Sequence, residues 1–464
     1  MTINKTTGRP FSPRCTGATL ALSIALLSGA CQGANDRLLA VTDPDIISPA
    51  QVVSAEAAVA VANGTINTFR SITGGGESTW MFGGLLADEW STSSTFIQND
   101  ETDQRHIQEN NGTVTTELRN LFRTRTRANE AIAALNIVRP DLRALLAEMY
   151  LARGFGEMQL ALDFCNGIPI SNGNASPPED GLPLTNQQVF ALAAASLDSA
   201  IGYANGTDAQ SVLMNRSARV VRARVALGVG DFTTAGTQVT GIPTAFAYQH
   251  TFSLTTSSNT LWGQGLSARR YSVGDSVEGN KRDILVANVI PFASAKDPRL
   301  PVTIPTTGSI NGQDGLTYTR TTTMWQQLTP VDVVNGIDAR MVEAEVALKG
   351  GNATQWLAIH NALRAAPPKL GEIQPAVMPA LVDPGTAEGR LSLHFREKAF
   401  WTFSRGQRLG DMRRLIRQYG RTEANTFPQG VHYKGGSYFK DVNLPVVTDE
   451  RNNPNFKGCI DRAP

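Results

Sequence analysis

Hydrophobic side chains recur at intervals of three and four residues through much of this chain, which is the pattern of amphipathic helices. Four such segments precede residue 202, and we expect helices over 47–70, 114–136, a stretch from 141, and 185–201. Thr185 followed by Gln188 is a capping-box pattern that marks the start of the last segment. The first half of the chain is therefore predicted to be largely helical.

The pattern of three later segments, 213–240, 338–366 and 390–419, predicts two helices joined by a turn in each. Gly230-Asp231-Phe232 supplies the turn in the first segment, and Gly350-Gly351-Asn352 supplies it in the second. This is the layout of tetratricopeptide-like pairs, which bury their apolar faces by stacking on neighbouring pairs. We therefore expect a mainly α fold, a tetratricopeptide-like scaffold of helical pairs with long irregular loops that carry the binding surface.

The helical period disappears between 241 and 337 and also between 71 and 112. Long irregular insertions in a compact domain are usually functional or disordered, and a high content of aromatic residues argues against disorder. We therefore expect the loops to carry recognition. The expected ligand-binding residues are the aromatic side chains of these loops: Trp80, Trp90, Trp262, Tyr271 and Trp325. Their flat rings offer apolar area at low entropic cost, while neighbouring amides and charges would fix hydroxyl groups.

The N-terminus has the organisation of an export signal. Lys5, Arg9 and Arg14 precede a short apolar stretch that ends in Ser28-Gly29-Ala30-Cys31. Small residues before a cysteine resemble the lipobox of bacterial lipoproteins, in which Cys31 would be acylated, although Ser28 stands where Leu is usual. The alternative is an ordinary cleaved signal peptide, with Cys31 a plain thiol.

Charge and cysteine content change this picture in two ways. The 42 basic and 41 acidic residues nearly balance, so the chain lacks the excess of positive charge that is typical of nucleic-acid-binding proteins. Of the four cysteines, Cys15 lies in the signal and Cys31 is the expected lipid site, which leaves Cys165 and Cys459 as the available intramolecular pair in an oxidising compartment. We favour that disulfide over two unpaired buried thiols.

Several short motifs, in a fixed order behind the cysteine, resemble the SusD/RagB family of outer-membrane nutrient-binding lipoproteins. They cover about 40–464, and no single one is specific. Arg405 and Val447 depart from the family pattern, and the first departure puts one buried ion pair in doubt. The motifs are Leu142-Arg143-Ala144 to Tyr150 with Phe155-Gly156 and Gly167-Ile168-Pro169, Glu343-Ala344-Glu345 with Asn361-x-x-Arg364, Arg396-Glu397 with Gly406-x-Arg408-x-x-Asp411-x-x-Arg414, and Leu444-Pro445-Val446 to Asn453-Pro454-Asn455.

The resemblance implies a lipid-anchored protein of the outer membrane, facing the cell exterior, that passes a glycan or peptide to a SusC-like TonB-dependent transporter. It also implies the domain plan: signal peptide 1–30, tether 31–43, and a domain 44–464 whose helical scaffold, 44–240 and 338–464, flanks a loop-rich insertion at 241–337.

The sequence carries no recognisable catalytic, metal or cofactor motif, and we expect a binding protein and not an enzyme. Glu397, Arg408 and Asp411 could act as acid and base if they faced a cleft, but a charge network that clamps two helices is the favoured interpretation. Two alternatives remain open: a helical-repeat envelope lipoprotein that scaffolds protein assembly, and a secreted hydrolase with an unfamiliar site.

Overall fold

The computed structural model describes residues 54–278, 284–305 and 311–464. The expected signal peptide, the lipid cysteine and the tether lie outside these residues. Long helices dominate the first part of the described chain: α3 (Ala55–Ser71), α6 (Gly112–Val138), α7 (Arg143–Asp163), α8 (Asn186–Tyr203) and α9 (Ala209–Val229). Side chains cap several of their N-termini, and the capping box of Thr185 and Gln188 is confirmed at α8.

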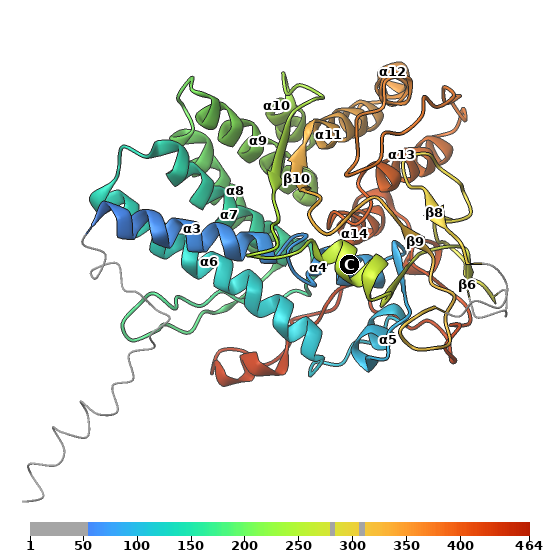
Figure 1. The fold of residues 1–464 in the computed structure, drawn as a ribbon, viewed down its shortest axis with the longest axis horizontal. Helices are drawn as coiled ribbons and strands as arrows, with labels where there is room; N and C mark the ends of the chain where they lie inside the picture. Colours follow the sequence, from blue (N-terminus) through green and yellow to red (C-terminus); the bar gives the residue numbers. More distant parts are fainter. Residues whose placement is uncertain (1–53, 279–283, 306–310) are drawn as a thin grey trace, which may run out of the picture. The chain divides into compact units, whose positions relative to one another are not determined.

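The predicted helical pairs are present and stack on one another. Helix α9 continues through Gly230, which has a positive φ of 81°, into α10 (Phe232–Val239). Helix α11 (Gly336–Lys349) is followed by α12 (Ala353–Ala365), and α10 packs against α11. The third pair comprises α13 (Ala387–Trp401) and α14 (Arg408–Tyr419), and α13 packs on α11. The mainly α, tetratricopeptide-like scaffold is confirmed (Figure 1).

The described parts of the segment between α10 and α11 form short antiparallel ribbons and turns. Strand β4 (Ala247–His250) pairs with β10 (Val331–Asn335), and β5 (Tyr271–Val273) pairs with β1 (Trp90–Thr92). A short π-helix, η2 (Trp262–Ser267), precedes β5. The remaining two-stranded ribbons among the described residues are β2 (Ile168–Pro169) with β3 (Pro183–Leu184), β6 (Val277–Glu278) with β7 (Ile284–Leu285), and β8 (Val302–Thr303) with β9 (Thr321–Thr322).

The expectation that 71–112 is irregular is wrong. This stretch contains two helices, α4 (Thr79–Leu86) and α5 (Ile97–Asp103), as well as strand β1. Every residue of α4 is buried. Because a helix that is apolar on all sides has no polar face, it shows no helical period in the sequence.

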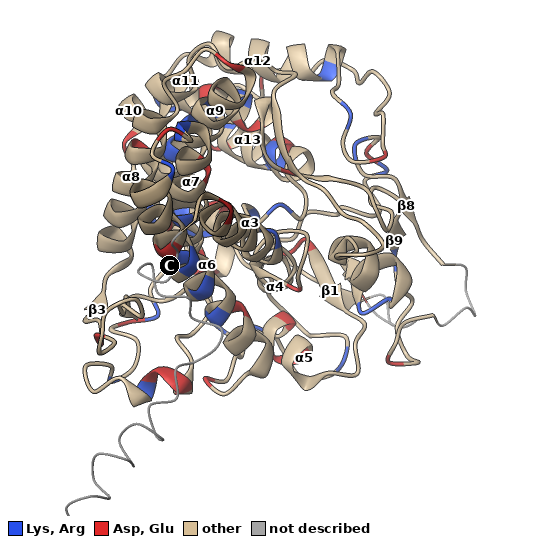
Figure 2. Ribbon diagram, turned by 60° about the vertical axis from the view of Figure 1, so that its left-hand side comes forward, with Lys and Arg blue, Asp and Glu red and all other residues tan. Residues whose placement is uncertain are grey.

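The charged helix segment 396–414 is a structural network, as favoured from the sequence. Glu397 is fully buried and accepts hydrogen bonds from Arg299 and Arg364. Arg405 forms two hydrogen bonds with the buried carboxylate of Asp338, at 3.0 and 2.7 Å. The residue that departs from the family pattern therefore forms a buried ion pair of its own. Figure 2 shows basic and acidic residues together among the helices around α13.

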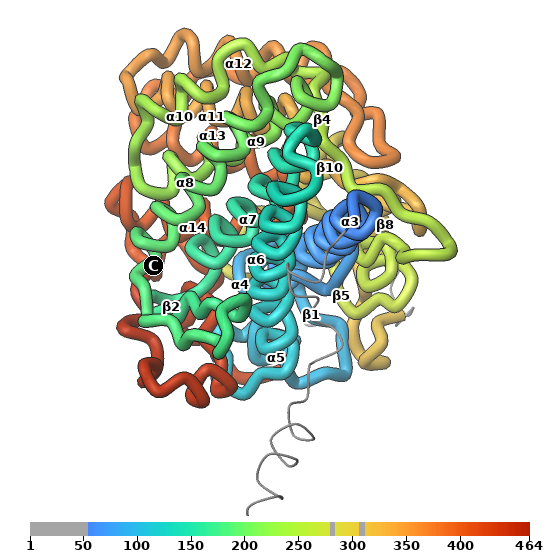
Figure 3. Tube along the Cα trace, turned by 90° about the vertical axis from the view of Figure 1, so that its left-hand side faces the viewer, coloured from blue at the N-terminus to red at the C-terminus, as the bar shows by residue number. Residues whose placement is uncertain are grey.

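Cys165 and Cys459 form a disulfide bond whose Cα atoms are 6.0 Å apart. It connects the segment after α7 to the C-terminal tail, which runs beside β2 (Figure 3). Asn166 and Asp461 form a β-bridge next to the bond, and the Ile460 N–H donates to the Asn166 carbonyl.

Among the described residues, no helix combines the length and the apolar character needed to cross a membrane.

Candidate functional site

Four of the five aromatic residues expected to bind ligand lie beneath the surface. Trp80 and Tyr271 are 0% exposed, Trp90 is 2% exposed and Trp325 is 5% exposed. In this structure these rings cannot stack on a ligand at the loop surface, so the expectation of direct contact is corrected for them. Trp262 is partly buried and therefore partly accessible. The sequence did not distinguish aromatic anchors of loops from aromatic contacts, because both occur in irregular segments.

The buried rings have a clear structural role. The indole N–H of Trp90 donates to the Ser404 hydroxyl at 2.9 Å, and its ring centroid lies 5.1 Å from that of Phe403. Trp325 stacks on the same phenylalanine, with its ring centroid 6.1 Å from that of Phe403 at an interplanar angle of 18°. The Tyr271 hydroxyl donates to Glu77 at 2.5 Å. These contacts fix the loops to the helical scaffold.

Above this layer, four segments distant in sequence meet at one surface, which we call the loop face: residues 90–97, 262–272, 311–317 and 433–434. The pairing of Ser91 with Ser272 joins the first two segments. The backbone N–H of Asp314 donates to the Ser93 carbonyl at 3.1 Å, and that of Gln313 donates to Arg269 at 3.2 Å. The third segment is therefore held against both of the others.

The loop face exposes an aromatic ring that the sequence analysis missed. Phe96 is 45% exposed, and the guanidinium carbon of Arg270 lies 4.6 Å from its ring centroid. Ile97 and Leu316 are 62% and 60% exposed. Phe96 follows a run of Ser and Thr and directly precedes α5. The sequence signal that could have identified Phe96 is an aromatic residue between a Ser/Thr run and the start of a helix.

Trp262 reaches the loop face from η2. The side-chain oxygen of Asn259 accepts the backbone N–H groups of Leu261 and Trp262, and its amide donates to the Thr329 carbonyl at 2.8 Å. Gly265 packs on Trp90, because a Cβ at this glycine would lie 3.3 Å from the indole ring. The buried Trp90 thus supports the turn that presents Trp262.

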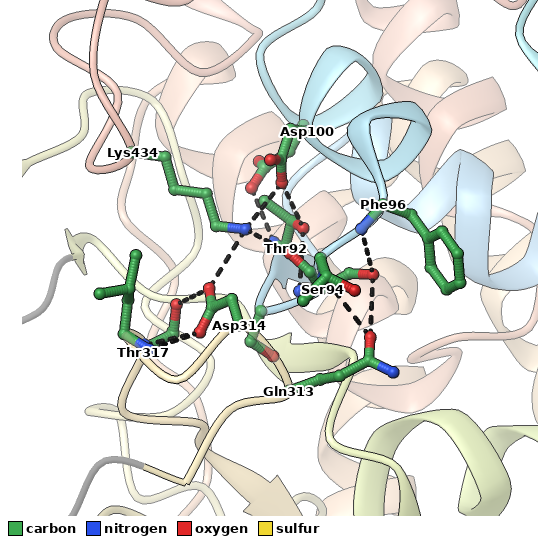
Figure 4. A network of polar contacts seen from close by, with 12 residues as sticks. Thr92, Ser94, Phe96, Asp100, Gln313, Asp314, Thr317 and Lys434 are labelled. Atoms are coloured by element: carbon green, nitrogen blue, oxygen red, sulfur yellow. Dashed lines mark hydrogen bonds and ion pairs between the residues drawn. The ribbon is translucent and has the colours of Figure 1, made fainter.

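A lysine holds the loop face together from its inner side (Figure 4). The ammonium of Lys434 lies 2.7 Å from the Ser94 carbonyl, 2.8 Å from an oxygen of Asp100 and 3.2 Å from an oxygen of Asp314. Its positive charge occupies the position between two carboxylates that would otherwise repel each other. Three segments of the loop face are therefore ordered around one cation.

Asp314 forms the turn that carries Leu316. Its carboxylate accepts the backbone N–H groups of Leu316 and Thr317, at 2.9 and 2.8 Å, and the Thr317 hydroxyl at 2.5 Å. Burial raises the pKa of Asp314, but these hydrogen bonds and the Lys434 charge outweigh burial, so the pKa lies below its ordinary value. The carboxylate stays ionised and the turn stays formed over the physiological pH range.

Gln313 provides an amide at the surface of this turn. Its side-chain oxygen accepts the Ser94 hydroxyl at 3.3 Å, and its amide nitrogen is directed away from that contact (Figure 4). Together with the exposed Phe96 ring, over which the Arg270 guanidinium lies, it forms an apolar surface with hydrogen-bond donors next to it. This combination suits a polar ligand that also has an apolar face.

Among the described residues, no group of three or more His, Cys, Asp or Glu side chains could hold a metal ion.

No protein-family model matches this chain, and no curated protein matches it. Solved structures do. A SusD-like carbohydrate binding protein from Bacteroides fragilis superposes with a TM-score of 0.64 at 11% identity, over 88% of this chain and 99% of that chain. A SusD superfamily protein from Bacteroides vulgatus gives 0.59 at 13% identity, and a laminarin binding SusD-like protein gives 0.54 at 16%, both over the same shares of the two chains. The chain therefore has the fold of SusD/RagB proteins, as its motifs predicted.

Proposed function

We propose that this protein is a nutrient-binding lipoprotein that holds a glycan at the loop face and passes it to a TonB-dependent transporter. The observation that carries the proposal is the exposed Phe96 ring, over which the Arg270 guanidinium lies, on a rigid base whose neighbouring segments carry Gln313 and Trp262. Sugars present an apolar ring face bordered by hydroxyl groups, and this surface offers the complementary arrangement. The Lys434 network orders the surface before ligand arrives, which reduces the entropy lost on binding.

The structural neighbours support the glycan over the peptide. Two of the three superposed proteins are described as carbohydrate binding or laminarin binding. The tightly paired charges of α13 and α14 lie in the interior, and this favours binding without chemical conversion. Acylation of Cys31 would anchor the protein at the outer membrane, facing the exterior, as the sequence resemblance implies.

The test is calorimetric titration of a panel of oligosaccharides into protein lacking residues 1–31. Phe96→Ala and Trp262→Ala should each weaken binding of the recognised glycan at least tenfold, because each removes an aromatic surface of the proposed site. Phe439→Ala is the matched control. Its side chain is 46% exposed, close to the 45% of Phe96, and its backbone contacts Gln104 at the opposite end of α5. Equal affinity in all three variants would refute the loop face as the binding site.

Anchoring and transfer have separate tests. Cys31→Ser in the full-length chain should move the protein from the membrane fraction to the soluble fraction. The transporter should copurify with the wild-type protein from detergent-solubilised membranes. Copurification with an envelope assembly complex, with no glycan bound, would instead favour the scaffold alternative.

A further inference from the structure

A cleft of about 520 Å³, lined by none of the loop-face residues, lies between the β4–β10 ribbon and the turn 368–372. Its volume is within the range of small-molecule sites, about 300–1,000 Å³. Its floor is one face of the ribbon. Ala247 and Gln249 point into it from β4, and their register partners Asn335 and Asp332 line it from β10.

The other face of this ribbon is packed on the core. Tyr248 and His250 are buried against Phe69, with ring centroids 6.4 and 4.7 Å away. Because side chains alternate along a strand, burial of this face directs the intervening residues toward the cleft. Ala247 is small and leaves room, while Gln249 is exposed. The ribbon therefore presents a polar platform with space above it.

The platform consists of hydrogen-bonding groups held by one another. The carboxylate of Asp332 accepts the amide of Gln249 and the amide of Asn335, each at 2.7 Å. Asn335 also caps α11, so its position is fixed by the helix. The Asn335 oxygen accepts the Asp338 N–H, but Gln249 keeps its oxygen and a second N–H and the carboxylate has further lone pairs, so the group can accept and donate toward a ligand above it.

The rim of the cleft is electrically balanced. Lys369 and Glu372 form an ion pair at 3.5 Å, and Glu372 also accepts the Thr329 hydroxyl at 2.6 Å. An anionic ligand would meet both Glu372 and Asp332. A wholly apolar ligand would desolvate the platform without replacing its hydrogen bonds. A cation would have to compete with the donors that already bind the Asp332 and Glu372 carboxylates.

At its inner end the cleft borders a smaller cavity of about 30 Å³, with which it shares Pro330, Asp332, Asn335 and Gly371. Trp80 and Trp325, two of the aromatic residues predicted to bind ligand, line this inner cavity. Its volume accommodates a group the size of a water molecule or a hydroxyl. The floor, the rim and the inner cavity together favour a small, uncharged ligand with many hydroxyl groups.

We infer that this cleft is a second binding site, for a neutral polyhydroxylated ligand the size of a mono- or disaccharide, separate from the loop face. Gln249 and Asp332 bind its hydroxyls, and Ala247 gives it space. The site does not depend on the loop face, since the two share no lining residue.

The test uses calorimetry and saturation-transfer NMR with neutral mono- and disaccharides, and with amino sugars and amino acids as comparison ligands. A Phe96→Ala/Trp262→Ala double variant should retain binding of a small neutral sugar, whereas Gln249→Ala and Ala247→Leu should each weaken it at least tenfold. Gln210→Ala, at an exposed position at the start of α9, is the matched control and should bind as the wild type does.

Loss of small-sugar binding in the loop-face variant would overturn the second site and leave the proposed function standing. Small-sugar binding that is unchanged by Gln249→Ala and Ala247→Leu would overturn it equally, as would binding of amines alone or of no small sugar. We expect the loop-face variant alone to lose long-glycan binding. We expect the cleft variants alone to lose small-sugar binding. Thermal unfolding of every variant verifies that it is folded.

Discussion

The disulfide between Cys165 and Cys459 should contribute strongly to stability, because it closes most of the chain into one loop. The two cysteines are separated by 294 residues. In the chain-entropy description, constraining a loop of this length in the unfolded state corresponds to about 5–6 kcal/mol at 25 °C, whereas measured losses on removing native disulfides are about 2–5 kcal/mol. We expect a loss of about 2–5 kcal/mol.

The assay is urea unfolding of protein lacking residues 1–31, followed by tryptophan fluorescence, with and without a thiol reductant. Reduction removes the bond without removing side-chain atoms, so it leaves no cavity at Cys165, which is fully buried. A Cys459→Ser variant is the control, since it should match the reduced wild type and should not respond to reductant. Coincident unfolding curves for oxidised and reduced protein would show that the bond does not constrain the unfolded chain, and the reasoning from loop length would fail.

Three further predictions concern buried charge and the loop face. Asp88→Asn should lower the free energy of unfolding by about 3–5 kcal/mol, because the buried guanidinium of Arg408 loses the carboxylate with which it pairs at 2.6 and 2.7 Å. An unchanged midpoint in urea unfolding would contradict this. Burial raises the pKa of Asp163 from 3.8 to about 7, so the folded state retains a proton that the unfolded chain releases, and this group's contribution to stability should fall as pH rises from about 4 to 7 and then level off. Asp163→Asn removes the titrating group, so the difference between the variant and wild-type unfolding free energies should change with pH between about 4 and 7. A difference that stays flat over this range would refute the assignment. Lys434→Met should weaken glycan binding at the loop face several-fold and increase hydrogen exchange at 311–317, because Asp100 and Asp314 would then repel each other. If the amides of 311–317 were as protected from exchange as in the wild type, Lys434 would not order this segment.

Local signals in the sequence predicted the scaffold well, and the reason is physical. A helix with one buried face repeats its apolar residues at the helical period, and its ends need specific caps. The pairs around Gly230 and Asn352 carry both signals and were predicted correctly. The disulfide followed from the number of cysteines. Helix α4 was missed because all its faces are buried, and its burial is a property of the neighbours that enclose it.

The binding surfaces were decided by the tertiary structure. Trp80 and Trp262 are both loop-region tryptophans in the sequence, yet one is fully buried and the other reaches the surface, depending on which segments pack above them. Gln249 and Asp332 are 83 residues apart along the chain and become one platform only through strand pairing. The sequence by itself thus determined the helices, their caps and the pair of cysteines, whose causes are local or countable. Which side chains meet a ligand depends on contacts between distant segments, and these exist only in the folded chain.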